Sequence, residues 1–159
     1  RPVSSHKFAI NDYASYRGMM MLTGIEHAKA KGNPHIVISE DGKAAVWAGA
    51  IDDLWKLGKP VGHGGPWLET EVKAREKSDP FLIGFYDRRE MTLSHAASSE
   101  VVFTVEVDPT GDGQWFKYAD FEVKPGASFK HKFPKAFQAR WIRISTNINT
   151  KATVNFEYR

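Results

Sequence analysis

The sequence predicts an all-β fold whose main part is an antiparallel β-sandwich, jelly-roll-like and with about seven strands. Three observations support this prediction. Apolar and polar residues alternate over short segments after residue 80, turn-forming residues separate these segments, and no segment there has the periodicity of a three-turn amphipathic helix. Alternation is typical of a sheet with one buried face, and strands that recur every ~8–15 residues are typical of sandwiches.

Each expected strand of this sandwich has one apolar face. In residues 100–107, for example, the side chains of Val101, Phe103 and Val105 lie on the same face. The turns between strands are rich in Pro, Gly and Asp, which suit the backbone angles of tight turns. The expected strands cover residues 81–86, 91–95, 100–107, 118–123, 128–133, 141–144 and 152–158.

Residues 1–70 have a different pattern. The expected elements are strands over 16–25, 35–40 and 43–47, a helical turn over 51–57 and a loop rich in Gly, Pro and His over 58–65. One or two hairpins without a second layer are not stable in isolation, so residues 1–70 either pack on the sandwich, residues 71–159, or belong to a larger β-structure. The chain starts at Arg1 without an initiator Met, which indicates a processed or excised piece of a longer protein.

Composition excludes several classes of protein. The chain has 159 residues, no Cys and a net charge of +3. Thiolate catalysis, disulfide scaffolds and Cys-ligated zinc are therefore excluded, and the His residues lack the spacing of a metal site. No apolar run approaches the ~20 residues of a membrane span. We expect no cofactor and no membrane span. The positive charge is concentrated in residues 123–156, which contain basic but no acidic side chains.

A degenerate Asp-box lies in the first part of the chain. Ser39, Asp41, Gly42 and Trp47 follow the order of the Ser-x-Asp-x-Gly-x-x-Trp hairpin of sialidase propellers, although Gly42 directly follows Asp41 and Trp47 comes late. This hairpin and its flanking sequence resemble the closing blade of secreted bacterial β-propeller proteins of the glycosidase or sialidase-like kind. Residues 78–108 resemble the β-sandwich that follows the propeller in such proteins. The Asp-box is a folding motif remote from the catalytic centre, so it implies architecture and no activity.

The resemblance implies a carbohydrate-associated protein that is secreted, periplasmic or on the cell surface, with a propeller domain upstream in the same chain. A complete propeller does not fit in ~70 residues, so we expect this C-terminal region to be a non-catalytic support that binds glycans. The alternative is a part of a glycoside hydrolase or polysaccharide lyase whose active site is completed by upstream blades. Asp52, Asp53 and His63 are then the catalytic candidates. Paired carboxylates suit glycoside hydrolysis, whereas Asp at the start of a helical turn is commonly a cap.

Four residues in the basic part of the chain are candidates for glycan binding. By strand alternation Lys130 and Lys132 share one face, and Trp141 and Arg143 share another. An aromatic platform beside cations suits an anionic polysaccharide, whereas lysines on exposed strands also prevent edge-to-edge aggregation. Trp67 is a further candidate because Trp stacks on sugars, and its alternative is packing at a domain seam. The cations are not interleaved with stacking aromatic residues, so no nucleic-acid partner is expected.

Two further features have both a functional and a structural interpretation. Asp108 and Asp112 occupy the first and fifth positions of a calcium loop, but the twelfth position is Ala119, and a plain hairpin turn is the alternative. The apolar residues 19–22 are either the surface of a dimerisation domain or a buried central strand.

Overall fold

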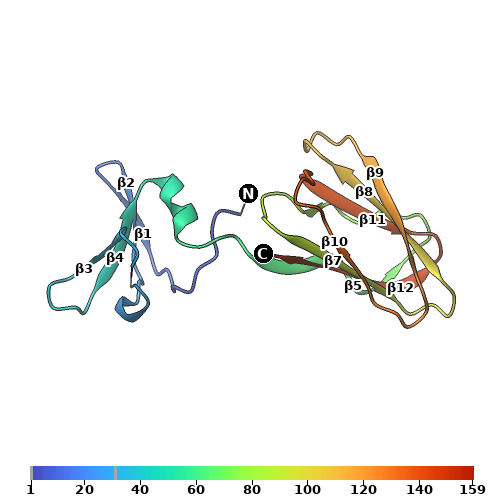
Figure 1. The fold of residues 1–159 in the computed structure, drawn as a ribbon, viewed down its shortest axis with the longest axis horizontal. Coiled ribbons are helices and arrows are strands. Elements are labelled where there is room, and N and C mark those ends of the chain that lie inside the picture. The colour runs from blue at the N-terminus through green and yellow to red at the C-terminus, as the bar shows by residue number, and fades with distance from the viewer. Residues whose placement is uncertain (1, 31) are drawn as a thin grey trace. The chain divides into compact units, whose positions relative to one another are not determined.

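The computed structural model describes residues 2–30 and 32–159. They form two compact units, residues 2–60 and residues 61–159, whose strands pair in antiparallel sheets (Figure 1). The fold is therefore all-β, as predicted. The division falls between Pro60 and Val61 and not near residue 70, because the strand that follows belongs to the second unit. None of the helices in these described ranges is long and apolar enough to span a membrane.

Residues 61–159 form an eight-stranded jelly roll. Its strands are β5 (Gly62–Val72), β6 (Phe81–Leu82), β7 (Arg89–His95), β8 (Val101–Asp108), β9 (Phe116–Val123), β10 (Phe129–Lys132), β11 (Trp141–Thr146) and β12 (Thr150–Tyr158). The first strand pairs with the last and so on inward: β5 with β12, β6 with β11, β7 with β10 and β8 with β9. This nested pairing is the jelly-roll topology that the sequence analysis predicted.

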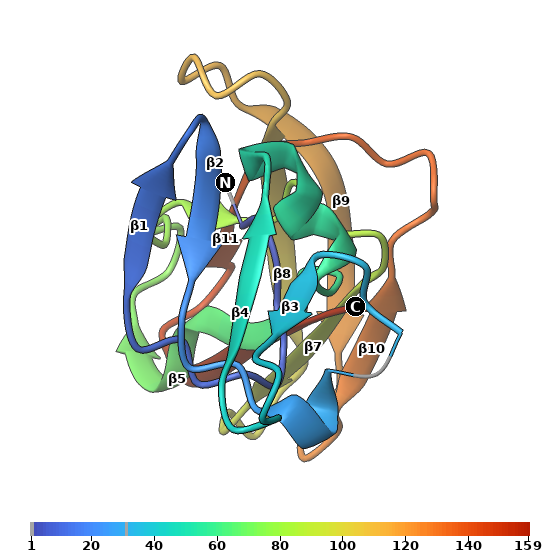
Figure 2. The ribbon, with the colours of Figure 1, turned by 90° about the vertical axis from the view of Figure 1, so that its left-hand side faces the viewer.

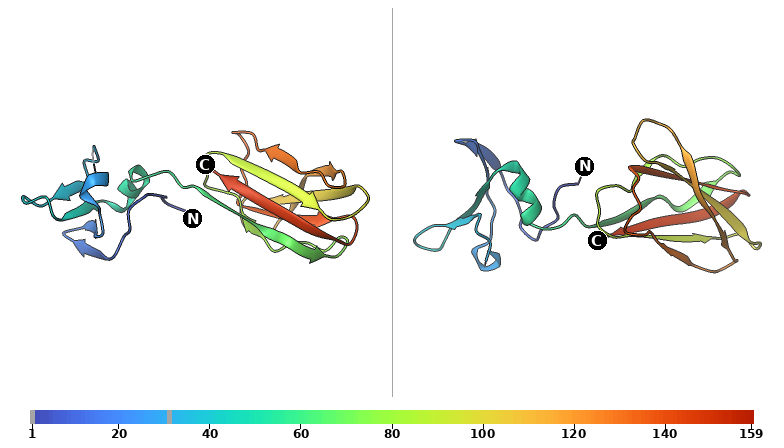
Figure 3. Two further views of the ribbon diagram at one scale, coloured as in Figure 1. Left: turned by 90° about the horizontal axis from the view of Figure 1, so that it is seen from below. Right: turned by 45° about the horizontal axis from the view of Figure 1, so that its top comes forward.

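Two further pairings join these ribbons into two sheets. Strand β7 pairs with β12, which gives a first sheet in the order β10-β7-β12-β5. Strand β8 pairs with β11, which gives a second sheet in the order β6-β11-β8-β9. Figure 3 shows β12, in red, between β7 and β5 of the first sheet.

Alternate side chains of the two sheets meet in the core. Met91 and Leu93 of β7 are fully buried, and so are Phe103 of β8 and Ile144 of β11. Burial of a side chain of this size contributes roughly 1.5–3 kcal/mol to the free energy of unfolding. The alternation of apolar and polar residues in these strands therefore correctly identifies the side chains that face the core.

Strand β5 covers residues for which the sequence predicted a loop. Pro66 lacks a backbone N–H, but β5 is an edge strand of the first sheet and pairs on one side only. A Cβ atom at Gly65 would overlap the carbonyl oxygen of Val154, so the close approach of β5 to β12 requires a glycine there. This edge strand brings the jelly roll to eight strands, compared with the expected number of about seven.

Aromatic side chains close the side of the jelly roll between the edge strands β9 and β10. The hydroxyl of Tyr118 lies 2.9 Å from Nε2 of His131. The rings of Phe121 and Phe133 each lie 4.8 Å from the same imidazole. Burial lowers the pKa of His131 and raises the pKa of Tyr118, because it disfavours the charged form of each ring.

Residues 2–60 form a single four-stranded sheet. Its strands are β1 (Tyr13–Tyr16), β2 (Met19–Leu22), β3 (Ile36–Ile38) and β4 (Ala45–Gly49), in the order β1-β2-β4-β3 (Figure 2). Two short 3-10 helices, η1 (His27–Lys29) and η2 (Ile51–Lys56), complete the unit.

The expected strand over residues 16–25 is instead a hairpin. Arg17 and Gly18 have φ angles of 48° and 79°, which fits the two-residue turn of a tight hairpin. Strand β2 pairs on both sides and its Leu22 is buried, which favours the central-strand interpretation of residues 19–22. The edge strands of this sheet are β1 and β3, and the side chain of Tyr13 in β1 is 73% exposed.

The residues of the degenerate Asp-box fold the hairpin between β3 and β4. The Ser39 hydroxyl donates to Asp41 Oδ1 at 2.7 Å, and the Lys43 N–H donates to the same oxygen at 3.1 Å. The Ala44 N–H donates to Ser39 Oγ at 2.9 Å. The bonds from Ser39 and Lys43 lower the pKa of Asp41. Trp47 follows in β4 and is fully buried.

Candidate anion-binding site

The four glycan-binding candidates in the basic part of the chain lie on two different sheets. Lys130 and Lys132 project outward from β10 in the first sheet. Trp141 and Arg143 lie on the outer face of β11 in the second sheet. Because the core separates the two sheets, these pairs face opposite sides of the jelly roll and cannot contact one ligand group together.

The charge of Arg143 is matched within the protein. Its Nε donates to Glu106 Oε2 at 2.9 Å, and its guanidinium carbon lies 4.3 Å from the ring centre of Trp115. Lys77 Nζ approaches the same Glu106 oxygen at 2.8 Å. Burial raises the pKa of Glu106, but the bonds from Lys77 and Arg143 outweigh it and the pKa lies below its usual range. The aromatic partner of this arginine is Trp115, and not Trp141 as the sequence analysis expected.

Trp67 and His63 have different environments in β5. Trp67 is 8% exposed and packs in the core of the jelly roll, opposite Val154 in β12. Trp67 is therefore a structural residue. It packs in the core of the sandwich and not at a domain seam. His63 is exposed and lies opposite Glu157 in the same pair of strands.

The two adjacent carboxylates lie at the start of η2. Asp53 Oδ2 accepts a hydrogen bond from the Ala50 N–H at 3.0 Å, which is the capping role that the sequence analysis weighed. Its Oδ1 accepts from Lys56 Nζ at 3.0 Å and lies 3.7 Å from His35 Nε2. The bonds from Lys56 and Ala50 lower the pKa of Asp53, which suits a fixed anion and not a general acid. Asp52 is exposed beside it.

The predicted calcium-loop residues organise a turn after β8. Asp108 is 2% exposed, and its two carboxylate oxygens accept from the Gly111 N–H at 2.7 Å and the Gly113 N–H at 2.9 Å. Asp112 accepts from the Gln114 N–H at 3.0 Å. These backbone bonds favour the interpretation as a plain turn. In the part of the chain that the structure describes, no group of three or more His, Asp or Glu residues could hold a metal ion.

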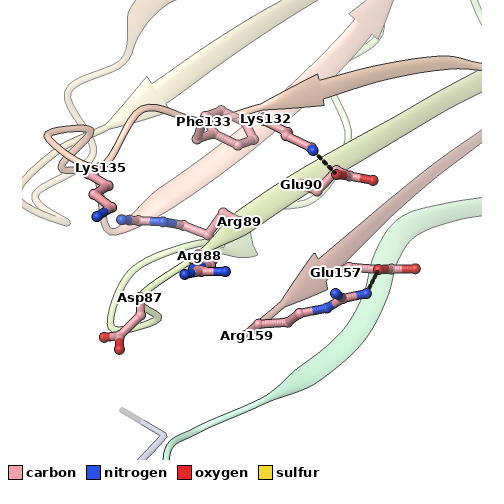
Figure 4. A pocket seen from close by; sticks show the side chains of 9 residues that line it. All are labelled: Asp87, Arg88, Arg89, Glu90, Lys132, Phe133, Lys135, Glu157 and Arg159. Carbon is pink, nitrogen blue, oxygen red and sulfur yellow. Dashed lines mark hydrogen bonds and ion pairs between the residues drawn. The ribbon is translucent and has the colours of Figure 1, made fainter.

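A basic cavity lies where β12 ends and β7 begins (Figure 4). Its volume is about 300 Å³. It is lined by Asp87, Arg88, Arg89, Glu90, Lys132, Phe133, Lys135, Glu157 and Arg159. Arg88 directly precedes β7 and Arg159 directly follows β12. Two backbone hydrogen bonds between them, at 2.6 and 2.9 Å, continue the pairing of these two strands. Lys132 is the only one of the predicted binding residues in this lining.

The cationic side chains of the lining outnumber its carboxylates, and three of them have no ion-pair partner in the described ranges. Lys132 lies 3.9 Å from Glu90, and Arg159 lies 3.1 Å from Glu157. Among residues 2–30 and 32–159, no carboxylate lies within 4.0 Å of the side-chain nitrogens of Arg88, Arg89 or Lys135. These three residues give the cavity positive charge that forms no direct ion pair within the described ranges, and Asp87 in the lining acts on Arg89 from a longer distance.

Arg89 is the most unusual of these residues because its side chain is buried. It is 7% exposed, and no described residue forms a hydrogen bond or ion pair with its guanidinium. Burial lowers the pKa of Arg89, while Asp87 and Tyr158 act in the opposite direction. Arginine nevertheless stays protonated in proteins, so the site holds a partly desolvated positive charge. In Figure 4 the charged ends of Arg89 and Lys135 point toward one another, as they would around a shared anion.

The amino-acid sequence contains only a weak signal for this cavity. Arg88 and Arg89 directly precede an alternating segment, and Lys135 belongs to the basic region after residue 123.

Comparison of the chain with protein-family models, with curated proteins and with solved structures finds no match. Fold and cavity together define the class of residues 61–159: a β-sandwich with a basic, partly buried cavity at one end of its first sheet.

Proposed function

We propose that residues 61–159 are a non-catalytic binding module that recognises the anionic group of a carbohydrate. In this proposal Arg89, Arg88 and Lys135 hold a carboxylate or sulfate in the basic cavity. The observation that carries the proposal is the buried guanidinium of Arg89 without a carboxylate partner in the described chain. A buried ion costs several kcal/mol to desolvate, and a ligand anion would offset that cost with paired, charge-assisted hydrogen bonds.

The resemblance to propeller-associated sandwiches supports a carbohydrate as the carrier of this anion. In the proposed protein the module follows a propeller domain in the same chain and acts outside the cytoplasm, as the C-terminal support of a carbohydrate-active protein. The candidate catalytic residues Asp53 and Asp52 belong to residues 2–60, and Asp53 is used as a helix cap. The third candidate, His63, lies in β5 and is exposed opposite Glu157, apart from both aspartates in the sequence. We therefore assign a binding role to residues 61–159.

Calorimetric titration of the full chain with oligogalacturonates, at low and high salt, tests this proposal. We expect salt-sensitive binding, and an Arg89→Met variant that binds about tenfold or more weakly, because a hydrogen-bonded ion pair is lost. Arg75→Met is the matched control, since Arg75 follows β5 at the opposite end of the first sheet and lines no described cavity. Equal affinity of the wild type and Arg89→Met, or no binding to anionic glycans, would contradict the proposal.

A further inference from the structure

The outer face of the first sheet is a continuous polar surface that starts at the basic cavity. Glu90, Thr92 and Ser94 alternate along β7 with the buried residues Met91 and Leu93, so their side chains point outward. In the neighbouring strand β12 the outward residues are Glu157, Asn155 and Thr153, each directly opposite one of these three. Directly opposed side chains lie about 4.5–5.5 Å apart at Cβ, so the three pairs form adjoining rows.

A second cavity lies at the other end of this surface. Its volume is about 310 Å³, and it is lined by Glu69, Ser94, His95, Ala96, Lys151 and Thr153. The basic cavity reaches Glu90 and Glu157, and the second cavity reaches Ser94 and Thr153. Only the row of Thr92 and Asn155 lies between them. Glu90 of the basic cavity and Ser94 of the second cavity are four residue steps apart along β7, which corresponds to about 13 Å.

The row between the cavities is neutral and its hydrogen-bonding groups are available. Within the described parts of the chain, the side chains of Thr92, Ser94 and Asn155 form no hydrogen bond. Hydroxyl and amide groups both donate and accept, which suits the hydroxyls of a sugar better than a chain of phosphates, which only accepts. The outward residues of β7 and β12 include no aromatic side chain on which a base could stack.

The second cavity also offers a charge. Lys151 Nζ lies 3.6 Å from Glu69, whose side chain is 75% exposed, so this surface pair contributes little to stability. The backbone N–H of Glu69 donates to the Thr153 hydroxyl at 2.9 Å, which fixes the rim of the cavity. Each cavity therefore contains at least one cation, Lys151 beside Glu69 in the second and Arg88, Arg89 and Lys135 in the first, and the row between the cavities is neutral.

We infer that the ligand is an oligosaccharide chain that lies along β7 and β12, from the basic cavity to the cavity at Lys151. Its anionic group lies at Arg89, and the hydroxyls of its further sugar units contact Thr92, Asn155 and Ser94. This inference rests on the proposed function and specifies its ligand: an extended anionic glycan, not a single sugar acid.

The test is a titration of the full chain with galacturonic acid and its oligomers up to the hexamer. We expect affinity to rise with length until the ligand spans both cavities. Asn155→Ala and Thr92→Val then weaken the hexamer about three- to tenfold and leave the monomer unchanged. Gln114→Ala and Thr110→Val are the matched controls, since both side chains are exposed in the turn after β8. Circular dichroism confirms that each variant is folded.

The outcomes separate the two levels of the proposal. If the monomer binds as tightly as the hexamer, or if Asn155→Ala and Thr92→Val leave the hexamer unaffected, the extended site is wrong and the cavity at Arg89 stands. If the wild type binds neither the monomer nor any oligomer, the proposed function fails and the extended site fails with it. Weaker binding of the hexamer alone in both variants supports the extended site.

Discussion

The guanidinium carbon of Arg89 lies 5.5 Å from the ring centre of Phe137. Phe137 belongs to the loop after β10, so this contact places an aromatic ring over a buried cation at the start of β7. A cation–π contact contributes ~0.5–2 kcal/mol, which offsets only part of the cost of burying the charge. The protein thus keeps Arg89 in place without neutralising it, and this is the basis of the proposed anion site.

Replacement of Arg89 by Met should not destabilise the free protein. An uncompensated buried charge is unfavourable, and an apolar side chain of similar length can replace it at no cost or with a gain of ~1–2 kcal/mol in the free energy of unfolding. Denaturant unfolding of the wild type and Arg89→Met measures this difference. A loss of more than about 2 kcal/mol would show that Arg89 is held for stability and not for a ligand.

Replacement of Arg143 should reduce stability and leave glycan binding unchanged, which is the reverse of the effects expected for Arg89. Arg143→Met removes the contacts with Glu106 and Trp115, so we expect a loss of about 1 kcal/mol in the free energy of unfolding. Glycan affinity should be unchanged, because Arg143 lies on the second sheet. Unfolding and titration of this variant beside Arg89→Met test both statements. Weaker glycan binding in Arg143→Met would move the site to the second sheet.

The stability of the jelly roll should fall as the solution becomes mildly acidic. Burial depresses the pKa of His131, so the unfolded chain takes up a proton at a higher pH than the folded chain does. The contribution of neutral His131 is fully present above the unfolded pKa of about 6.5 and is lost as the pH falls through the folded pKa. We expect His131→Gln to reduce the slope of unfolding free energy against pH in this range.

Denaturant unfolding at a series of pH values between neutral and mildly acidic measures that slope. His63→Gln is the control, because His63 is exposed on β5 of the same sheet. A slope in His131→Gln equal to that of the wild type would show that other groups carry the pH dependence.

The turn after β8 should depend on Asp108 and not on calcium. Asp108→Ala removes the acceptors of two backbone N–H groups, so the midpoint of thermal unfolding should fall. Addition of calcium should leave the midpoint of the wild type unchanged, because both carboxylate oxygens of Asp108 are already bonded to the backbone. A midpoint that rises with calcium concentration would restore the interpretation as a calcium loop.

The two units should unfold in separate steps. Residues 2–60 bury a small cluster, Leu22, Ile25, Ala30 and Trp47, and leave large apolar side chains such as Ile51 exposed. Residues 61–159 contain the larger core. We expect calorimetry of the full chain to show a weaker first transition that a chain of residues 61–159 lacks. A single transition in the full chain would contradict this division.

The strands of the jelly roll are predictable from the sequence because alternation follows burial directly. Residues 100–107, for example, correspond to β8, and residues 152–158 to β12, to within about two residues. Strand β5 is an exception because Gly65 and Pro66 resemble loop residues. Their suitability for a strand depends on its position at a sheet edge and on its distance from β12, and neither is a local property of the sequence.

The basic cavity could not be predicted either, because it also depends on contacts between distant parts of the chain. Arg88 precedes β7 and Arg89 begins it, Lys135 follows β10 and Arg159 follows β12, so the cavity forms only when nested pairing brings these three strand ends together. Alternation assigns Lys132 and Arg143 to strand faces, but it does not say to which sheet each strand belongs. The excess of positive charge is therefore evident in the sequence, whereas the place where the cations gather depends on the fold.

The most direct test of the anion site is a nitrogen–proton correlation NMR titration of the full chain with hexagalacturonate. The reporters are the side-chain Nε–H signal of Arg89 and the indole signals of Trp141 and Trp115. Trp141 belongs to β11 of the second sheet, and Trp115 directly precedes β9 of the same sheet. We predict that the Arg89 signal and the backbone signals of Arg88 and Lys135 shift on binding, while both indole signals stay in place. Shifts of the indole signals with an unchanged Arg89 signal would contradict the proposed site.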